Sequence, residues 1–94
     1  MKEDCVSFEL AKKLREKGYY YEGRNIYDVL KWLREEKYLY VSPSLFHIGY
    51  RPYIQSTLFE NDKTYTDSWF LKSYYSSYEE AAIAGIGYIL DNLI

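Results

Sequence analysis

The sequence is poor in residues that carry specialised chemistry. Cys5 is the only cysteine and His47 the only histidine among 94 residues. A single cysteine excludes an internal disulfide and a zinc site built from cysteines, and nothing in the chain requires an oxidising compartment. We therefore expect a cytoplasmic protein with no metal ion and no bound cofactor.

The sequence also lacks a large excess of charge of one sign, and it lacks long apolar segments. Twelve basic residues stand against fourteen acidic ones, a formal charge of −2, so no overall field attracts nucleic acid or an anionic membrane. The longest apolar run spans only residues 81–90, about half of the ~20 residues that a membrane helix needs. Charged residues open the chain and precede no apolar segment, so we expect neither a secretory signal nor a membrane partner.

Glycine and proline are scarce, with five and two positions, which argues against a disordered or fibrous chain. Apolar residues make up 48% and charged residues 28%, the balance of a globular protein. Because 94 residues are near the usual size of one domain, we expect a single domain over 1–94. An N-terminal helix and connector form its first part, over 1–24, and the remaining elements lie in 25–94.

Two helices are predicted in the first part of the chain. Ser7 is a suitable N-cap for a helix over about 8–17, and Gly18 suits its end. Residues 19–24 then form either a short extended segment or only a connector. Asn25 caps the second helix, in which Trp32 is expected at the boundary between core and solvent. The apolar stripe of this helix has the spacing i, i+3, i+4, i+7 and consists of Ile26, Val29, Leu30 and Leu33.

The middle of the chain has the residue types and the alternation that are typical of β-strands. Alternating residues predict a strand over about 38–42, which Pro43 ends, followed by a loop to Gly49. Aromatic and β-branched residues predict a second strand over 50–59 and a third over 64–71. The polar turn between these two strands favours an antiparallel hairpin.

A last helix is predicted from about residue 78. Ser77 and Glu80 have the spacing of a capping box, and Ala81, Ala84 and Gly85 form a strip of small residues that lets another element approach closely. Helices and strands are segregated along the chain, which favours an α+β fold. We expect two N-terminal helices, a three-stranded antiparallel meander and a C-terminal helix, with the helices on one face of the sheet and the other face open.

The sequence contains no recognisable set of catalytic residues. Cys5 and His47 could in principle form a nucleophile and a base, but nothing in the sequence brings them together. Glu79 and Glu80 are explained by their place at a helix N-terminus. Gly85 and Gly87 lack the third glycine of a dinucleotide-binding fingerprint. The sequence therefore predicts a protein that is not an enzyme.

Tyrosine is the unusual component, with thirteen residues. Tyrosine offers contact area with few rotors and a polar tip, and we take Tyr38, Tyr40, Tyr53 and Tyr65 as candidate binding residues on the sheet. The first interpretation is a protein-interaction module that uses a tyrosine-rich sheet face or edge, with a protein partner or by self-association. The alternative is a purely structural role: tyrosines are good strand formers and can cover a solvated sheet without binding a ligand.

Alternation predicts which side chains share a face. If the tyrosines of the first two strands point away from the helices, the opposite set packs into the core; this set consists of Leu39, Val41, Ile54 and Leu58. If they point inward, the rings themselves are core. A second function, nucleic-acid binding with aromatic stacking, is the less favoured one because neither half of the chain is strongly basic; its contacts would be Lys12, Lys13, Lys17, Lys31, Arg34 and Lys37.

Residues 25–93 resemble a double-stranded RNA-binding domain in the order and length of their elements. Where that family has lysines at the start of its last helix, this chain has Tyr78, Glu79 and Glu80, so the resemblance implies the topology and not RNA binding. Three short segments also resemble segments of small uncharacterised proteins from gut anaerobic bacteria and their mobile elements. They are Val6-Ser7-Phe8-Glu9-Leu10-Ala11, Trp32-Leu33-Arg34-Glu35 and Tyr78-Glu79-Glu80-Ala81-Ala82.

Overall fold

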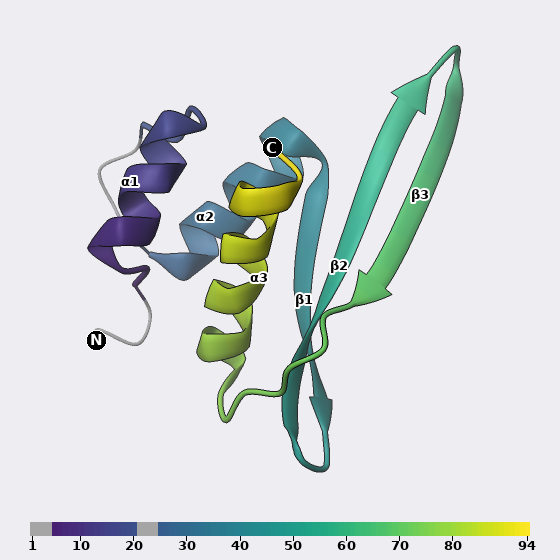
Figure 1. Ribbon diagram of the computed structural model, residues 1–94. Helices are drawn as coiled ribbons and strands as arrows, with labels where there is room; N and C mark the ends of the chain where they lie inside the picture. The colour runs from purple at the N-terminus through teal and green to yellow at the C-terminus, as the bar shows by residue number, and fades with distance from the viewer. Residues whose placement is uncertain (1–4, 21–24) are drawn as a thin grey trace.

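The computed structural model describes residues 5–20 and 25–94 (Figure 1). Part of the connector predicted over 19–24, and the charged first residues, lie outside the described residues. The elements in chain order are α1 (Phe8–Glu16), α2 (Ile26–Trp32), the π-helical turn η2 (Leu33–Lys37), β1 (Leu39–Phe46), β2 (Gly49–Glu60), β3 (Lys63–Phe70) and α3 (Tyr78–Asn92).

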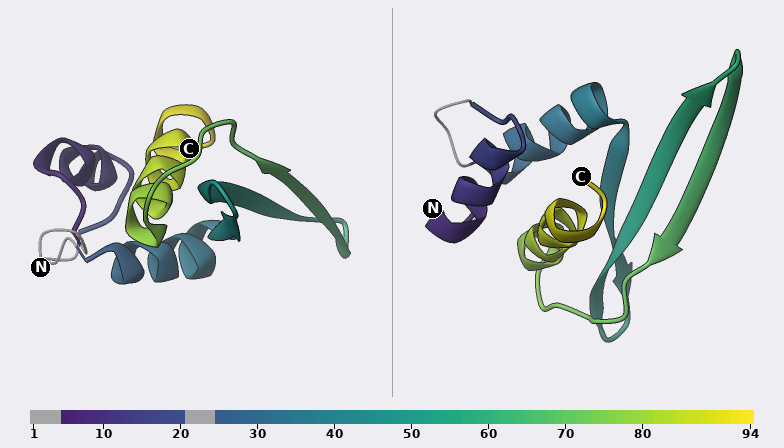
Figure 2. Two further views of the ribbon diagram at one scale, coloured as in Figure 1. Left: turned by 90° about the horizontal axis from the view of Figure 1, so that it is seen from below. Right: turned by 45° about the horizontal axis from the view of Figure 1, so that its top comes forward.

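The molecule has a sheet with helices on one side only. The strands are antiparallel in the order β1-β2-β3. Helix α3 lies against β1 and β2, and α1 is the outermost helix (Figures 1 and 2). Among residues 5–20 and 25–94, no element lies over the other face of the sheet in these views. The predicted α+β fold, with a three-stranded meander and one open sheet face, is confirmed.

Side-chain caps begin the three α-helices where the sequence predicted them. Ser7 Oγ accepts a hydrogen bond from the Leu10 N–H at 3.2 Å, and Asn25 Oδ1 accepts one from the Tyr27 N–H at 2.9 Å. Ser77 Oγ accepts from the Glu80 N–H at 3.2 Å. The Glu80 carboxylate accepts from the Ser77 hydroxyl at 3.1 Å, so the reciprocal bond of this capping box uses a side-chain donor.

The buried apolar side chains form a cluster between the helices and the inner side of β1 and β2. Leu14, Ile26, Leu33, Ile54 and Ile86 are fully buried. Trp32 is buried as well, which corrects the expectation that it lies at the boundary. Its ring is packed edge-on against buried Tyr19, with the ring centroids 5.3 Å apart, so residues just after α1 cover it.

Gly85 allows the close approach of α3 to the sheet. A Cβ at this position would lie 2.5 Å from Val41 Cγ1 and 3.4 Å from Ile54 Cδ1. The first distance is too short for any real Cβ contact, and both neighbours are core side chains. Gly87, two residues further on, has room for a side chain, because a Cβ there would make only an ordinary van der Waals contact with Leu10 Cδ1, at 4.0 Å. The strip of small residues therefore has a packing reason at Gly85.

Strand β1 continues through Pro43 to Phe46, which corrects the predicted strand end at 42 and the predicted loop after it. Pro43 lies directly opposite Pro52 in β2. Thr57 N–H donates to the Tyr38 carbonyl, and counting alternate pairs from this bond makes Pro43 and Pro52 a pair that exchanges no backbone hydrogen bonds. Pairing between β1 and β2 needs no N–H at either of these positions, so the missing N–H of proline does not interrupt the strand.

The end of the β2–β3 hairpin extends beyond the helices as an arm, defined here as residues 57–66 (Figure 1). Asn61 and Asp62 form its two-residue turn, with φ of 50° and 63°, as in the hairpin turns that match strand twist. Leu58 is 58% exposed, which corrects its predicted place in the core. Leu58 has the inward orientation of Ile54, but no helix covers the sheet at this level.

Candidate protein-interaction surface

The open sheet face, called the outer face below, is defined by strand alternation. Val41 and Ile54 are buried against the helices, so the residues that alternate with them point the other way. They are Tyr40, Ser42, Ser44 and Phe46 of β1, Arg51, Tyr53, Gln55, Thr57 and Phe59 of β2, and Thr64, Thr66, Ser68 and Phe70 of β3. Arg51 is the single charged residue among them.

Four aromatic rings and Arg51 gather at one end of the outer face. We call Phe46, Arg51, Tyr53, Phe70 and Tyr74 the outer cluster. The Tyr53 and Phe70 ring centroids are 4.7 Å apart, and Phe46 meets both Phe70 and Tyr74 edge-on at 5.7 Å. These are the distances of favourable aromatic pairs. Phe70 and Tyr74 are each 39% exposed, so the cluster presents rings to solvent.

Arg51 is held by three contacts within this cluster. Its Nε donates a hydrogen bond to the Leu71 carbonyl. Its Cζ lies 5.0 Å from the Phe70 ring centroid and 5.5 Å from that of Tyr74, within the range of cation–π attraction. A guanidinium has five N–H donors in a fork, and the Nε bond uses one of them. The aromatic rings therefore position a cation that keeps donors for a further acceptor.

A bulge in the chain after β3 brings Tyr74 to this face. Leu71 N–H donates to the Pro52 carbonyl at 2.9 Å, and Tyr75 exchanges two backbone bonds of 2.7 Å with Tyr50. Residues 72–74 therefore lie opposite a single residue of β2, which bends the segment. Gly49 has a φ of 142°, and a Cβ there would lie 2.7 Å from the Tyr75 carbonyl oxygen, so only glycine permits this close pairing.

The four predicted tyrosines do not all lie together. Tyr40 and Tyr53 point to the outer face, and Tyr38, just before β1, packs edge-on against Phe59 of that face at 5.0 Å. Tyr65 has the opposite orientation: it pairs with Leu58 on the inner side of the arm and is 51% exposed. The outer face thus contains Tyr40 and Tyr53, Tyr38 packs beside it, and Tyr65 belongs to another surface.

Four residues of the outer cluster were missed by the sequence argument. Phe46 fell in a predicted loop, and Tyr74 fell between predicted elements. Phe70 had a usable signal, because a two-residue turn at 61–62 aligns it with Tyr53 by simple counting. Arg51 shares its alternation with Tyr53 and could have been found in the same way. No pattern in the sequence indicated the position of Tyr74.

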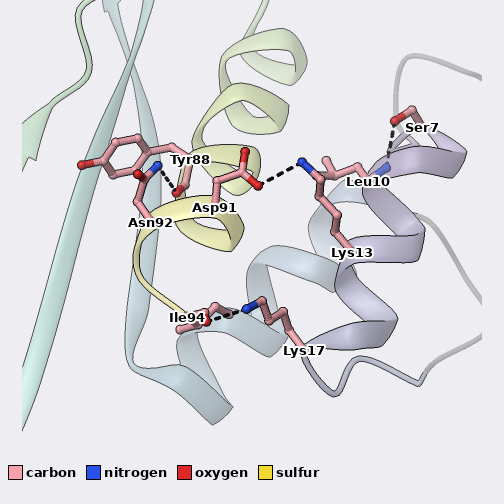
Figure 3. Close-up of polar contacts among 8 residues, drawn as sticks. All are labelled: Ser7, Leu10, Lys13, Lys17, Tyr88, Asp91, Asn92 and Ile94. Carbon is pink, nitrogen blue, oxygen red and sulfur yellow. Dashed lines mark hydrogen bonds and ion pairs between the residues drawn. The ribbon is translucent and has the colours of Figure 1, made fainter.

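The basic residues of the nucleic-acid alternative lie on the helical side of the sheet. Figure 3 shows two of them in contacts within the chain: Lys13 Nζ is 2.9 Å from an Asp91 carboxylate oxygen, and Lys17 Nζ donates to the Ile94 carbonyl at 2.6 Å. Lys37 Nζ lies 5.6 Å from the Trp32 ring centroid. Lys12, Lys31 and Arg34 are exposed. The structure does not bring these cations together with Tyr40 and Tyr53, which are on the opposite side.

The residues considered for catalysis are also separate. Cys5 pairs with Asn25 before α1, whereas His47 lies in the turn between β1 and β2, and these segments are far apart in Figures 1 and 2. Within 5–20 and 25–94, no three histidine, cysteine or acidic side chains are grouped to hold a metal ion. In the same residues no helix has the length and apolar character needed to cross a bilayer.

A groove of about 690 Å³ lies between the end of β3, the following segment and α3. Trp69 and Tyr88 line it, with their ring centroids 6.3 Å apart. Two of its polar side chains are engaged within the chain, because Asp91 pairs with Lys13 and the Asn92 amide donates to the Tyr88 carbonyl, and the groove has no cluster of rings around a cation like that of the outer face. The outer face is therefore the stronger candidate surface.

Comparison with known proteins identifies no relative: no protein-family model, curated protein or solved structure matches the chain. The surface is therefore interpreted from its own geometry.

Proposed function

We propose that this protein is a non-enzymatic interaction module whose outer face binds a segment of a partner protein. The observation that carries the proposal is the outer cluster, in which two rings contact Arg51 and two more rings pack against those, on a sheet face that no helix of the described residues covers. Tyrosine, phenylalanine and arginine are enriched in the central parts of protein interfaces, where a few such residues provide most of the binding free energy.

The chemistry of the face indicates the chemistry of the partner. Arg51 is the one charged residue in the alternating set that defines the face, so a carboxylate is the complementary group, and an arginine fork binds a carboxylate in a bidentate geometry. The surrounding rings favour apolar or aromatic neighbours of that carboxylate. The proposed ligand is therefore a peptide segment with acidic residues next to aromatic ones.

Peptide titration tests this proposal. The probe is the blocked peptide Glu-Phe-Glu-Phe-Glu, and the matched controls are Lys-Phe-Lys-Phe-Lys and Glu-Ala-Glu-Ala-Glu. We expect amide chemical shifts around Arg51, Phe70 and Tyr74 to move with the first peptide alone. Arg51→Gln should lose this response, whereas Arg34→Gln, a change at an exposed arginine of the helical side, should keep it. Equal responses to all three peptides would contradict the proposal.

Two tyrosine variants separate a binding role from a structural one. Tyr40→Ser and Tyr53→Ser remove rings of the outer face, where neither side chain is fully buried. We expect weaker peptide binding and only a small change in melting temperature. A loss of about 3–5 kcal/mol of stability, the cost of truncating a buried aromatic residue, would show that the rings are core and that the binding assignment is misplaced.

Nucleic-acid binding is the alternative outcome of the same titration. Phosphate contacts make affinity fall steeply as salt concentration rises. Short RNA and DNA duplexes and single strands, added at low salt, should cause no shift. Salt-sensitive binding that is lost on replacing Lys12, Lys31 and Arg34 together would replace the proposed function with this one.

A further inference from the structure

The free edge of β3 presents unpaired backbone groups. Thr57 directs its N–H toward β1, where it bonds to the Tyr38 carbonyl at 3.1 Å. Its partner Thr66 therefore points its own N–H and carbonyl away from β2, and so does Thr64 two residues earlier. Ser68 follows the same alternation, and its N–H is bonded to Asp67 Oδ1 at 3.0 Å. For Thr64 and Thr66, no bond among the described residues satisfies the outward N–H.

The two edges of the sheet differ in their capacity to accept another strand. On β1 the residues whose backbone groups point outward include Pro43, which has no N–H, and proline is a common protection of exposed edges. On β3 no proline interrupts the eight residues of the strand, and all of them except Trp69 are exposed. An added strand therefore fits the β3 edge better than the β1 edge.

The charges of β3 are complementary to themselves. Lys63 and Asp67 are on the same side of the strand, about 13 Å apart at ~3.3 Å per residue, too far for an ion pair within one strand. When two copies of β3 run antiparallel with Tyr65 opposite Tyr65, each Lys63 lies opposite Asp67 of the second copy. A register shifted by four residues, with Asp67 opposite Asp67, places like charges together, which is unfavourable.

The same register satisfies the backbone and the apolar side chains. Thr64 of one copy lies opposite Thr66 of the other, so the unpaired N–H and carbonyl groups of both residues meet. Leu58 is opposite Tyr65 within each chain, and these side chains are 58% and 51% exposed. Two copies bring both pairs into one continuous apolar strip across the junction.

We propose that two copies of this chain dimerise by antiparallel pairing of their β3 edges, centred on Tyr65, with Lys63 bonded to Asp67 of the second copy on both sides of the two-fold axis. The pairing joins the two sheets into one. It extends the proposed function by naming a second copy as a partner, and it uses the edge of the arm rather than the outer cluster. Either proposal can fail without the other.

Charge reversal in two separate chains tests the dimer. Lys63→Asp places two carboxylates opposite each other at each end of the pairing, and Asp67→Lys places two lysines there. We expect each variant alone to dimerise about tenfold or more weakly than the unchanged chain, since each replaces two favourable pairs by two repulsive ones. In an equimolar mixture of the two variants, the heterodimer places a carboxylate opposite a lysine at both ends of the pairing, so the heterodimer should form. Sedimentation velocity over a range of protein concentrations measures all of these states.

Matched controls and a second measurement complete the test. Lys31→Asp and Asp28→Lys make the same charge changes on exposed positions of α2 and should leave dimerisation unchanged, as should Arg51→Gln. Hydrogen exchange should show protection of the Thr64 and Thr66 amides that increases with protein concentration. An unchanged chain that stays monomeric, or charge variants that fail to associate when mixed while circular dichroism shows both folded, would overturn the proposal.

Discussion

Strand β2 passes through two different regions: the part of the sheet that α3 covers, called the body below, and the uncovered arm. Comparing them shows that the direction in which a side chain points does not by itself decide whether it is buried. Ile54 and Leu58 are four residues apart on the same side of this strand, yet Ile54 is 0% exposed and Leu58 is 58% exposed. Alternation assigns both side chains to the inner side. Only Ile54 has α3 above it, so the helix layer decides which of two equivalent residues becomes core.

The two regions should also differ in local stability. In the body the sheet has three strands and a helix layer, whereas the arm is a two-stranded ribbon, which has marginal stability by itself in water. Regions with few buried apolar contacts open at lower free energies than the core. The arm is therefore suited to adjust to a partner while the body remains folded.

The largest expected effect comes from truncating the matched pair on β2. Ile54→Ala removes a fully buried side chain and should lower the free energy of unfolding by about 2–5 kcal/mol. Leu58→Ala should lower it by less than about 0.5 kcal/mol, as for other surface substitutions. Urea titration measures both values. Equal losses would show that the arm contributes to the core.

The next effect tests the contact between α3 and the body. Gly85→Ala forces a Cβ against Val41, and overpacking of this kind typically costs about 1–3 kcal/mol. Gly87→Ala makes only an ordinary van der Waals contact with Leu10 and should stabilise the helix, by up to about 1 kcal/mol. Thermal unfolding of the two variants should therefore move in opposite directions, and a stabilised Gly85→Ala would mean that α3 sits further from the sheet.

A smaller effect concerns the turn of the arm. Asp62 has a φ of 63°, a left-handed conformation that glycine adopts without cost. Asp62→Gly should stabilise the arm locally by about 0.5–1 kcal/mol. Slower hydrogen exchange of the Tyr65 amide, with an unchanged melting temperature, is the expected result. A parallel rise in melting temperature would show that arm and body unfold as one unit.

The smallest effect is expected at the surface of the helix layer. Lys13 and Asp91 form an ion pair with side chains that are 49% and 54% exposed, and such pairs contribute little because water screens them. Lys13→Ala should cost no more than about 0.5 kcal/mol relative to Lys12→Ala in chemical denaturation. A larger loss would mean that this contact fixes α1 on α3.

Local patterns determined most of the elements in this protein. Ser7, Asn25 and Ser77 cap their helices as predicted, because a cap is a contact with a backbone N–H two or three residues away. The polar turn after Glu60 placed the hairpin, and alternation put Tyr40 and Tyr53 on one face. These features depend on neighbours in the chain or on a fixed strand period, and both can be read from the sequence.

Contacts between distant segments decided the rest. Strand β1 continues past Pro43 because Pro52 is opposite it, in a pair that needs no N–H from either. Leu58 is exposed because α3 does not reach the arm, and Tyr74 joins Arg51 because a bulge beside Gly49 turns the chain onto the outer face. Burial and clustering depend on which segments meet in space, so the outer cluster became visible only in the tertiary structure.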